Sequence, residues 1–425
     1  MAFFSSSNKP ESKNISIPVQ SVYMQRGPKQ NSITSKRLQV IDLVRAFSIL
    51  AVLAHHLGCY YISQQSQSPF LAYLWFRFMI NGSFGVTMFF VVSGFVITRL
   101  IASQPNGLFN PDFREFYSRR IGRIIPLLTL VCFIGLMFIY FFPSESHAFE
   151  LIFKNSNAPP SPAFWVSIAT FSFNWYPIFS ARMHERNAFG LQWGLLWSLS
   201  VEEQFYFFYP FVLKCLRNKR SLIIFLSAFI VFGPISCQIF GYFFPTYPFL
   251  EKIYLGDFSF IAMGCLLYLV SASYTEVLSK NKKRCFQFCF LGIFLFFIFY
   301  WHQYVSVNDW WFFWGPTFLE AWAQTFFAFG VFFFLLGGLH LSFFNSNYWS
   351  ILGRVGKLSY GGYLYHVIIL YLLWPFFTRR NEWLNLFILA VGTFALAELS
   401  YRYFEVPANL FIRKALSRKS STADQ

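Results

Sequence analysis

Apolar segments long enough to cross a bilayer recur from about residue 38 to residue 405, with no polar block between them large enough to fold separately. An α-helix needs about 20 apolar residues to span roughly 30 Å of hydrocarbon. The chain is therefore predicted to be an all-α integral membrane protein with about ten transmembrane helices. The expected spans are 38–61, 84–101, 124–142, 195–213, 221–243, 256–272, 286–302, 317–341, 358–377 and 383–405.

The composition supports the membrane assignment and indicates the orientation. The chain is 56% hydrophobic and 12% charged, about half the charge of a soluble domain. Its net charge of +16 does not indicate nucleic-acid binding, because the basic residues alternate with apolar spans. With ten spans, both termini and four of the connecting segments lie on the same side of the membrane. These segments hold 24 of the 34 Lys and Arg residues, so the positive-inside rule predicts that this side, with both termini, is cytoplasmic. These segments are 1–40, 102–123, 214–220, 273–284, 342–357 and 408–425.

Three regions are predicted along the chain. Residues 1–37 read as a disordered basic cytoplasmic tail, 38–407 as one membrane-embedded domain, and 408–425 as a short basic cytoplasmic tail. The apolar pieces 71–80 and 163–175 are too short to span and are expected at the interface or as a re-entrant segment. The seven cysteines lack metal-ligand spacing, so no metal site is expected.

Arg45 and His56 lie eleven residues apart in the first predicted span. Eleven residues make three helical turns plus about 20°, so both share one face, about 16 Å apart. A lone Arg near a helix end also snorkels to headgroups, but intramembrane ionisable residues favour a functional role. The separation is close to the reach of a pantetheine arm. His55, about 100° away on the helix, faces elsewhere.

Arginines follow the second predicted span at positions 114, 119, 120 and 123. Such a cluster is a common topology signal. It equally suits a clamp for the phosphates of a nucleotide, since guanidinium forks bind phosphate in two-point contacts. We therefore treat Arg119, Arg120 and Arg123, with Arg45, as candidate donor-binding residues.

Two adjacent acids, Glu202 and Glu203, lie inside the fourth predicted span. Their burial is difficult to explain by structure alone. They point about 100° apart, so at most one orients an imidazole. A histidine with a carboxylate partner is the usual arrangement of a general base, because the acid fixes the tautomer and stabilises the imidazolium.

Five further residues are candidates for supporting roles. Ser93 breaks an apolar run beside Gly94, which favours close helix packing over a nucleophile. Ser200 precedes the two acids, and Ser359, Tyr360 and His366 open the ninth predicted span. For a single histidine on an apolar helix, packing is the simpler interpretation.

Taken in order, these motifs resemble acyltransferase family 3, the membrane-bound O-acyltransferases that include O-antigen and exopolysaccharide O-acetylases. The resemblance covers about residues 38–407. Its most specific parts are Arg-x10-His and the segment Trp-Ser-Leu-Ser-Val-Glu-Glu-Gln-Phe-Tyr. The family's Arg and His map onto Arg45 and His56, and its acid maps onto Glu202, with Glu203 as second choice.

The resemblance implies transfer of an acyl group, most often acetyl, from cytoplasmic acyl-coenzyme A to a hydroxyl of an extracytoplasmic glycan. Acyl-coenzyme A is then a co-substrate, and no permanently bound cofactor is expected. We expect His56 to act as general base, oriented by Glu202; an acyl-His56 intermediate is the alternative. The protein itself is expected in the inner membrane of a bacterium. A transporter or flippase of a glycan or lipid-linked substrate is the rival class, but no pair of related halves with interrupted helices is visible.

Overall fold

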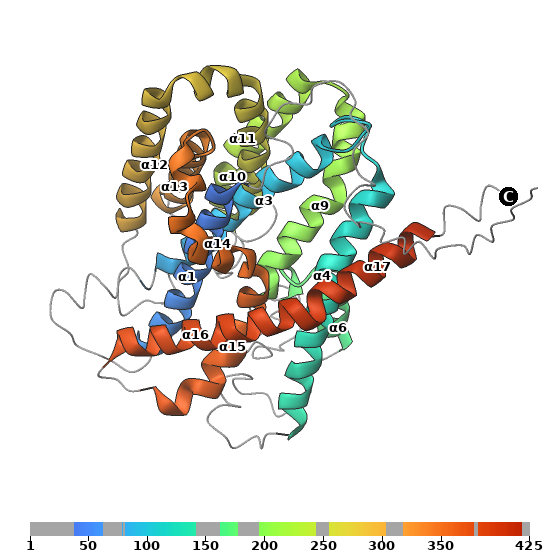
Figure 1. Ribbon diagram of the computed structural model, residues 1–425, viewed down its shortest axis with the longest axis vertical. Coiled ribbons are helices and arrows are strands. Elements are labelled where there is room, and N and C mark those ends of the chain that lie inside the picture. Colours follow the sequence, from blue (N-terminus) through green and yellow to red (C-terminus); the bar gives the residue numbers. More distant parts are fainter. Residues whose placement is uncertain are drawn as a thin grey trace, which may run out of the picture. The chain divides into compact units, whose positions relative to one another are not determined.

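The structure is a computed structural model, and helices account for nearly all of the chain that it describes (Figure 1). It describes residues 38–62, 79, 81–141, 162–176, 195–243, 255–302, 318–377 and 381–418. No strand occurs in these ranges, so the all-α prediction is confirmed for them. The predicted tail 1–37 and most of segment 71–80 lie outside the described residues.

The helices follow the predicted spans closely. The long ones are α1 (Gln39–Ile62), α3 (Phe84–Ala102), α4 (Phe113–Phe141), α9 (Leu196–Leu216), α10 (Lys219–Phe243), α11 (Leu255–Lys280), α12 (Lys282–His302), α13 (Phe318–Gly338), α15 (Ser359–Leu373) and α16 (Glu382–Ser400). The short ones are η1 (Asn81–Ser83), α6 (Pro162–Ala169), η4 (Ser342–Asn345), η5 (Asn347–Trp349), α14 (Ser350–Lys357), η6 (Trp374–Phe376), the π-helix η7 (Tyr401–Glu405) and α17 (Val406–Arg418).

Six helical stretches are long and apolar enough to cross a membrane within the described part of the chain. They are Gln39–Gly58, Phe84–Ala102, Phe113–Met137, Lys219–Cys237, Gly256–Lys280 and Glu382–Leu416. Trp322–Gly338 and Ser359–Leu373 are apolar but shorter. The chain is thus a multi-pass membrane protein, while ten spans and the orientation of the termini stay predictions.

α1 runs along α3, and glycines set the distance between them. A Cβ on Gly82 would lie 2.0 Å from the carbonyl oxygen of Ala51, and one on Gly85 would lie 2.5 Å from that of Ser48. Residue numbers increase in one segment where they decrease in the other, since Gly82 lies opposite Ala51 and Gly85 opposite Ser48, so the two helices are antiparallel. Ser93 lies about 12 Å beyond Gly85, towards the end of α1 that carries Arg45.

The C-terminal end of the described chain differs from the expectation of a tail beginning at residue 408. α16, η7 and α17 follow one another as a long, nearly continuous rod (Figure 1), and α17 packs against α4. Arg402 and Glu405 are three residues apart in the sequence, but Arg402 pairs with Glu398, one turn earlier. The π-helical turn of five residues changes the helix phase between 401 and 405, which separates the two side chains.

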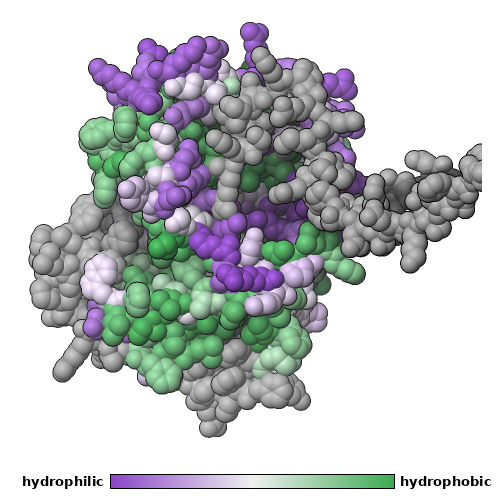
Figure 2. Space-filling view, viewed as in Figure 1, coloured by the Kyte–Doolittle hydropathy of each residue, from purple (hydrophilic) through white to green (hydrophobic). Residues whose placement is uncertain are grey.

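Basic residues gather at helix ends. The turn between α11 and α12 holds Lys280, Lys282, Lys283 and Arg284. It lies at the top of Figure 1, and Figure 2 shows a hydrophilic upper edge there, with a broad hydrophobic area lower on the same face. α6 has eight residues, too few to cross a bilayer, as predicted for 163–175.

Candidate active site

Arg45 and His56 lie on one unbroken helix, as their spacing predicts. Both belong to α1, which is buried along most of its length between α3, α14 and α15. Eleven residues of helix separate them by about 16 Å along the axis. α1 therefore presents a cation and an imidazole at two different depths of the same packed core.

The imidazole of His56 lies against a second imidazole, that of His366 on α15. The ring centroids are 5.0 Å apart. The His366 ring is fully buried, and its Nδ1 lies 2.7 Å from the carbonyl oxygen of Tyr363. A carbonyl only accepts, so Nδ1 carries the proton and Nε2 keeps a lone pair. That Nε2 has no hydrogen-bond partner among the described residues.

The structure favours His56 over its neighbour as the residue that meets His366. His55 lies on another side of α1, where its Cβ approaches Gly82 of η1. Its ring still contacts the His56 ring, with centroids 5.3 Å apart. Packing alone therefore does not describe His366, because the imidazole that it contacts belongs to His56, a candidate catalytic residue.

At the Arg45 end of α1 lies a cavity of about 310 Å³ lined by five arginines, which we call the arginine cavity. Its walls come from α1, α3, α4, α9, α15 and α17. Its polar and charged lining residues are Arg45, Ser93, Arg119, Arg120, Arg123, Glu202, Tyr206, Tyr360, Asn409 and Arg413. All four predicted donor-binding arginines thus line one cavity.

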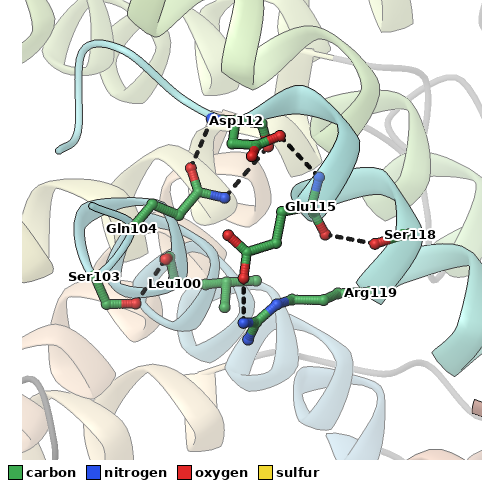
Figure 3. A network of polar contacts seen from close by, with 7 residues as sticks. All are labelled: Leu100, Ser103, Gln104, Asp112, Glu115, Ser118 and Arg119. Atoms are coloured by element: carbon green, nitrogen blue, oxygen red, sulfur yellow. Dashed lines mark hydrogen bonds and ion pairs between the residues drawn. The ribbon is translucent and has the colours of Figure 1, made fainter. Parts of the chain in front are cut away.

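Two of the five arginines are engaged by carboxylates. Figure 3 shows Arg119 directed at Glu115, one turn back on α4, whose first turn is capped by the carboxylate of Asp112. Arg120 pairs with Glu203, and both side chains are largely buried. The Arg120 guanidinium also lies 3.9 Å from the ring centre of Tyr206. Arg120 therefore holds α4 to α9 while its charge is largely neutralised.

The other three, Arg45, Arg123 and Arg413, form no ion pair with any residue that the structure describes. They come from α1, α4 and α17, so three separate helices each supply one cation. Arginines without an ion-pair partner around a cavity attract an anion, and phosphate suits guanidinium geometry best. Arg413 and Asn409 are one turn apart on α17, in the segment that the sequence predicts to be a tail.

Glu202 lies in the arginine cavity, and its Oε1 accepts hydrogen bonds from Ser93 and, at 2.5 Å, from the hydroxyl of Tyr206. This location differs from the expectation that Glu202 orients His56: the carboxylate shares a cavity with Arg45, whereas His366 is the side chain against His56. Its nearest chemical effect is to offset part of the charge of the arginines.

A smaller cavity of about 70 Å³, the inner cavity, adjoins the arginine cavity. The two share Arg45, Ser93, Leu199, Glu202 and Tyr360. The rest of the inner cavity is mostly apolar and aromatic, with Val86, Phe89, Phe90, Ser198, Ser359, Tyr363 and Leu364.

Tyr363 links the inner cavity to the two histidines. Its hydroxyl contacts Ser198 at 2.7 Å and donates to the carbonyl of Leu195, while its ring lies 5.8 Å from that of His366. Tyr363 thus lines the inner cavity and also lies beside His366, which packs against His56. Neither histidine lines either of the two cavities.

The remaining predicted residues divide into two groups. Ser359 lines the inner cavity, and Tyr360 lines both while its hydroxyl donates to the carbonyl of Ile124. Ser200 lines neither: it donates to Leu196 and accepts from the amide of Phe173, so it anchors the segment after α6. No group of three or more possible metal ligands occurs within the described ranges.

Comparison with known proteins identifies the family. Residues 38–402 match the model of an acyltransferase domain, acyltransferase family 3. The chain belongs to this family. The family is one of membrane acyltransferases, and the matched segment contains Arg45, His56, Glu202 and His366 but ends before Arg413.

Three relatives show how far the similarity of this chain extends. It is 27% identical to the O-acetyltransferase OatA of Staphylococcus aureus over 86% of this chain, and 26% identical to the putative peptidoglycan O-acetyltransferase YrhL of Bacillus subtilis over 89%. The peptidoglycan O-acetyltransferase OatA of Listeria monocytogenes is 27% identical over 88%. In each case the match covers 56% of the relative, so the chain spans about half the length of these proteins. No solved structure matches the chain.

Proposed function

We propose that this protein is an O-acyltransferase of the bacterial cytoplasmic membrane that moves an acyl group, acetyl in the first place, from cytoplasmic acyl-coenzyme A to a hydroxyl of an extracytoplasmic glycan. The observation that carries the proposal is the arginine cavity, which shares wall residues with the inner cavity, whose Tyr363 lies beside His366. The relatives named as peptidoglycan O-acetyltransferases make a peptidoglycan-type sugar the first acceptor to test.

The donor would bind with its phosphates in the arginine cavity. Arg45, Arg123 and Arg413 are the arginines there without an ion-pair partner among the described residues, and each can give a charge-assisted hydrogen bond to a phosphate oxygen. The thioester end of the pantetheine arm would then reach the inner cavity, whose walls are largely apolar and aromatic. The polar head and the thioester end of the coenzyme thus match the two cavities in chemical character.

The transfer itself needs a base for the acceptor hydroxyl. As the hydroxyl oxygen attacks the acyl carbon, a C–O bond forms, the C–S bond breaks, and the hydroxyl proton passes to neutral His56. The departing thiolate then takes a proton from the imidazolium. His366, with Nδ1 tied to Tyr363, keeps its Nε2 lone pair available beside His56 and would stabilise the protonated ring. An acyl group carried on His56 between two such steps is the covalent variant.

The donor part is tested with radiolabelled acetyl-coenzyme A, soluble peptidoglycan oligosaccharides and purified protein in detergent. Arg413→Ala removes one phosphate partner without touching the histidines. We expect its KM for the donor to rise about tenfold or more, the value of one charge-assisted hydrogen bond, with kcat little changed. Arg220→Ala, an exposed arginine at the start of α10, is the matched control and should keep the wild-type KM.

Transfer of label to the oligosaccharide by wild type, and none by His56→Ala, is the expected outcome. Equal donor KM values for Arg413→Ala and wild type would show that the arginine cavity does not bind the coenzyme. Failure of wild type to transfer label from acetyl-coenzyme A to any glycan would overturn the proposed reaction.

A further inference from the structure

Two aromatic rings from different helices form part of the wall of the inner cavity. Phe89 of α3 and Tyr363 of α15 both line it and meet edge to face, with ring centroids 6.2 Å apart. Phe89 also packs against a buried cluster that includes Leu53 and Leu57 of α1, three residues before and one residue after His56. The ring pair is therefore a part of the cavity wall that is also packed close to the histidines, since the Tyr363 ring lies beside that of His366.

The two rings are held differently. The hydroxyl of Tyr363 is bound by Ser198 and the carbonyl of Leu195, which fixes the ring at this side of the inner cavity. Phe89 has no polar group and is partly exposed to the cavity. Neighbouring Phe90 is almost completely buried and packs edge to face on Trp197. Phe89 is therefore a wall residue whose ring can be made smaller without breaking a hydrogen bond.

The free space is small. A water molecule requires about 10 to 15 Å³ measured with a water-sized probe, so about 70 Å³ holds only a few small groups. A thioester and a methyl group fit such a space, whereas each further methylene needs room that Phe89 and Tyr363 occupy. In a close-fitting pocket one methylene changes kcat/KM by about 10- to 200-fold.

We infer that the Phe89–Tyr363 pair limits the length of the transferred acyl chain, with Phe89 as the specificity-determining residue. This inference rests on the proposed function, since it assumes that an acyl thioester enters the inner cavity. It predicts that the protein uses short acyl donors because the ring of Phe89 limits the room for the acyl chain. Phe89 lies on α3, one turn before Ser93, which lines the arginine cavity.

The test compares kcat/KM for acetyl-, butyryl- and hexanoyl-coenzyme A. Wild type should prefer acetyl. Phe89→Ala should raise the hexanoyl-to-acetyl ratio at least tenfold, and Phe89→Leu should raise the butyryl-to-acetyl ratio by a smaller factor. Phe290→Ala, which removes a ring of α12 that is 72% exposed, is the matched control and should keep the wild-type profile.

The outcomes separate this inference from the proposed function. Phe89→Leu decides the question if Phe89→Ala does not elute as a folded protein. An active wild type that uses hexanoyl- and acetyl-coenzyme A equally well, or Phe89 variants with unchanged ratios, would overturn the length limit and leave the acyltransferase intact. A wild type that uses no acyl-coenzyme A at all would overturn both.

Discussion

At the scale of single residues, the pairing of His56 with His366 changes the interpretation of the candidate site. The two imidazoles come from distant parts of the chain, and the Tyr363 carbonyl fixes which nitrogen of His366 carries its proton. The acid expected beside His56, Glu202, lies instead with Ser93, Tyr206 and the arginines. His56, the proposed base, therefore has an imidazole neighbour at one end of the candidate site, and the Glu202 carboxylate lies at the other end.

His366→Ala tests whether this neighbour contributes to the reaction. Since the ring lies outside both cavities, donor binding should persist, while stabilisation of protonated His56 is lost. We expect kcat to fall about 100-fold or more, within the range of general acid–base contributions, with the donor KM close to that of wild type. Steady-state kinetics with varied acetyl-coenzyme A measures both constants.

The control for this experiment is His340→Ala, a histidine that contacts Ser271 away from both cavities. It should retain the wild-type kcat. An unchanged kcat in His366→Ala, or an equal loss in both variants, would remove His366 from the mechanism.

At the scale of helices, reciprocal glycine contacts determine where the cavity walls stand. Gly94 of α3 lies against Ile261 of α11, and Gly264 of α11 lies against Val91 of α3. A Cβ on Gly94 would lie 1.9 Å from the carbonyl oxygen of Ile261, and one on Gly264 would lie 1.9 Å from that of Val91. Small residues let helices approach closely in a membrane. Because Ser93 precedes Gly94, this crossing also positions one edge of the arginine cavity.

Gly94→Ala should therefore destabilise the protein although alanine is the better helix former. The added methyl group meets backbone, which cannot move aside as a flexible side chain does, so overpacking of at least about 1–3 kcal/mol is expected. Thermal unfolding in detergent should show a Tm several degrees below that of wild type.

Gly353→Ala in α14 is the matched control, since the nearest atoms to its added Cβ would lie 3.8 Å away. It should be neutral or gain up to about 1 kcal/mol from reduced backbone freedom in the unfolded chain. Equal Tm values for the two variants would refute the close crossing.

At the scale of the whole molecule, the distribution of basic residues predicts the side of the membrane on which the arginine cavity lies. The segments predicted to be cytoplasmic hold 24 of the 34 basic residues, and four of the five arginines of the arginine cavity come from two of them, 102–123 and 408–425. The arginine cavity, the proposed donor site, is therefore predicted to lie on the side that the positive-inside rule assigns to the cytoplasm.

Membrane vesicles of defined orientation test this assignment. Inside-out vesicles should consume externally added acetyl-coenzyme A, because the arginine cavity then faces the medium. Right-side-out vesicles should do so only after permeabilisation, since the charged coenzyme does not cross the bilayer. Release of free coenzyme A measures both, and the reverse pattern would contradict the predicted topology.

Sequence alone determined the features that depend on local order along the chain. Helical periodicity places Arg45 and His56 on one face of one helix, since neither needs a distant partner to be located. Apolar segment length predicts an all-α membrane protein, and most observed helices begin within a few residues of the expected positions. The ordered motifs indicate the family that the comparison then shows.

The tertiary structure decided which side chains meet. Periodicity gives the direction of Arg119, Arg120 and Glu202 from a helix axis, but not the distant residue on the facing helix. Glu203 therefore takes Arg120, and Glu202 takes Ser93, by packing between helices distant in sequence. Arg413 lines the arginine cavity because α17, which the sequence predicts to be a tail, continues from η7 and packs against α4. These pairings arise from long-range packing, which no local pattern encodes.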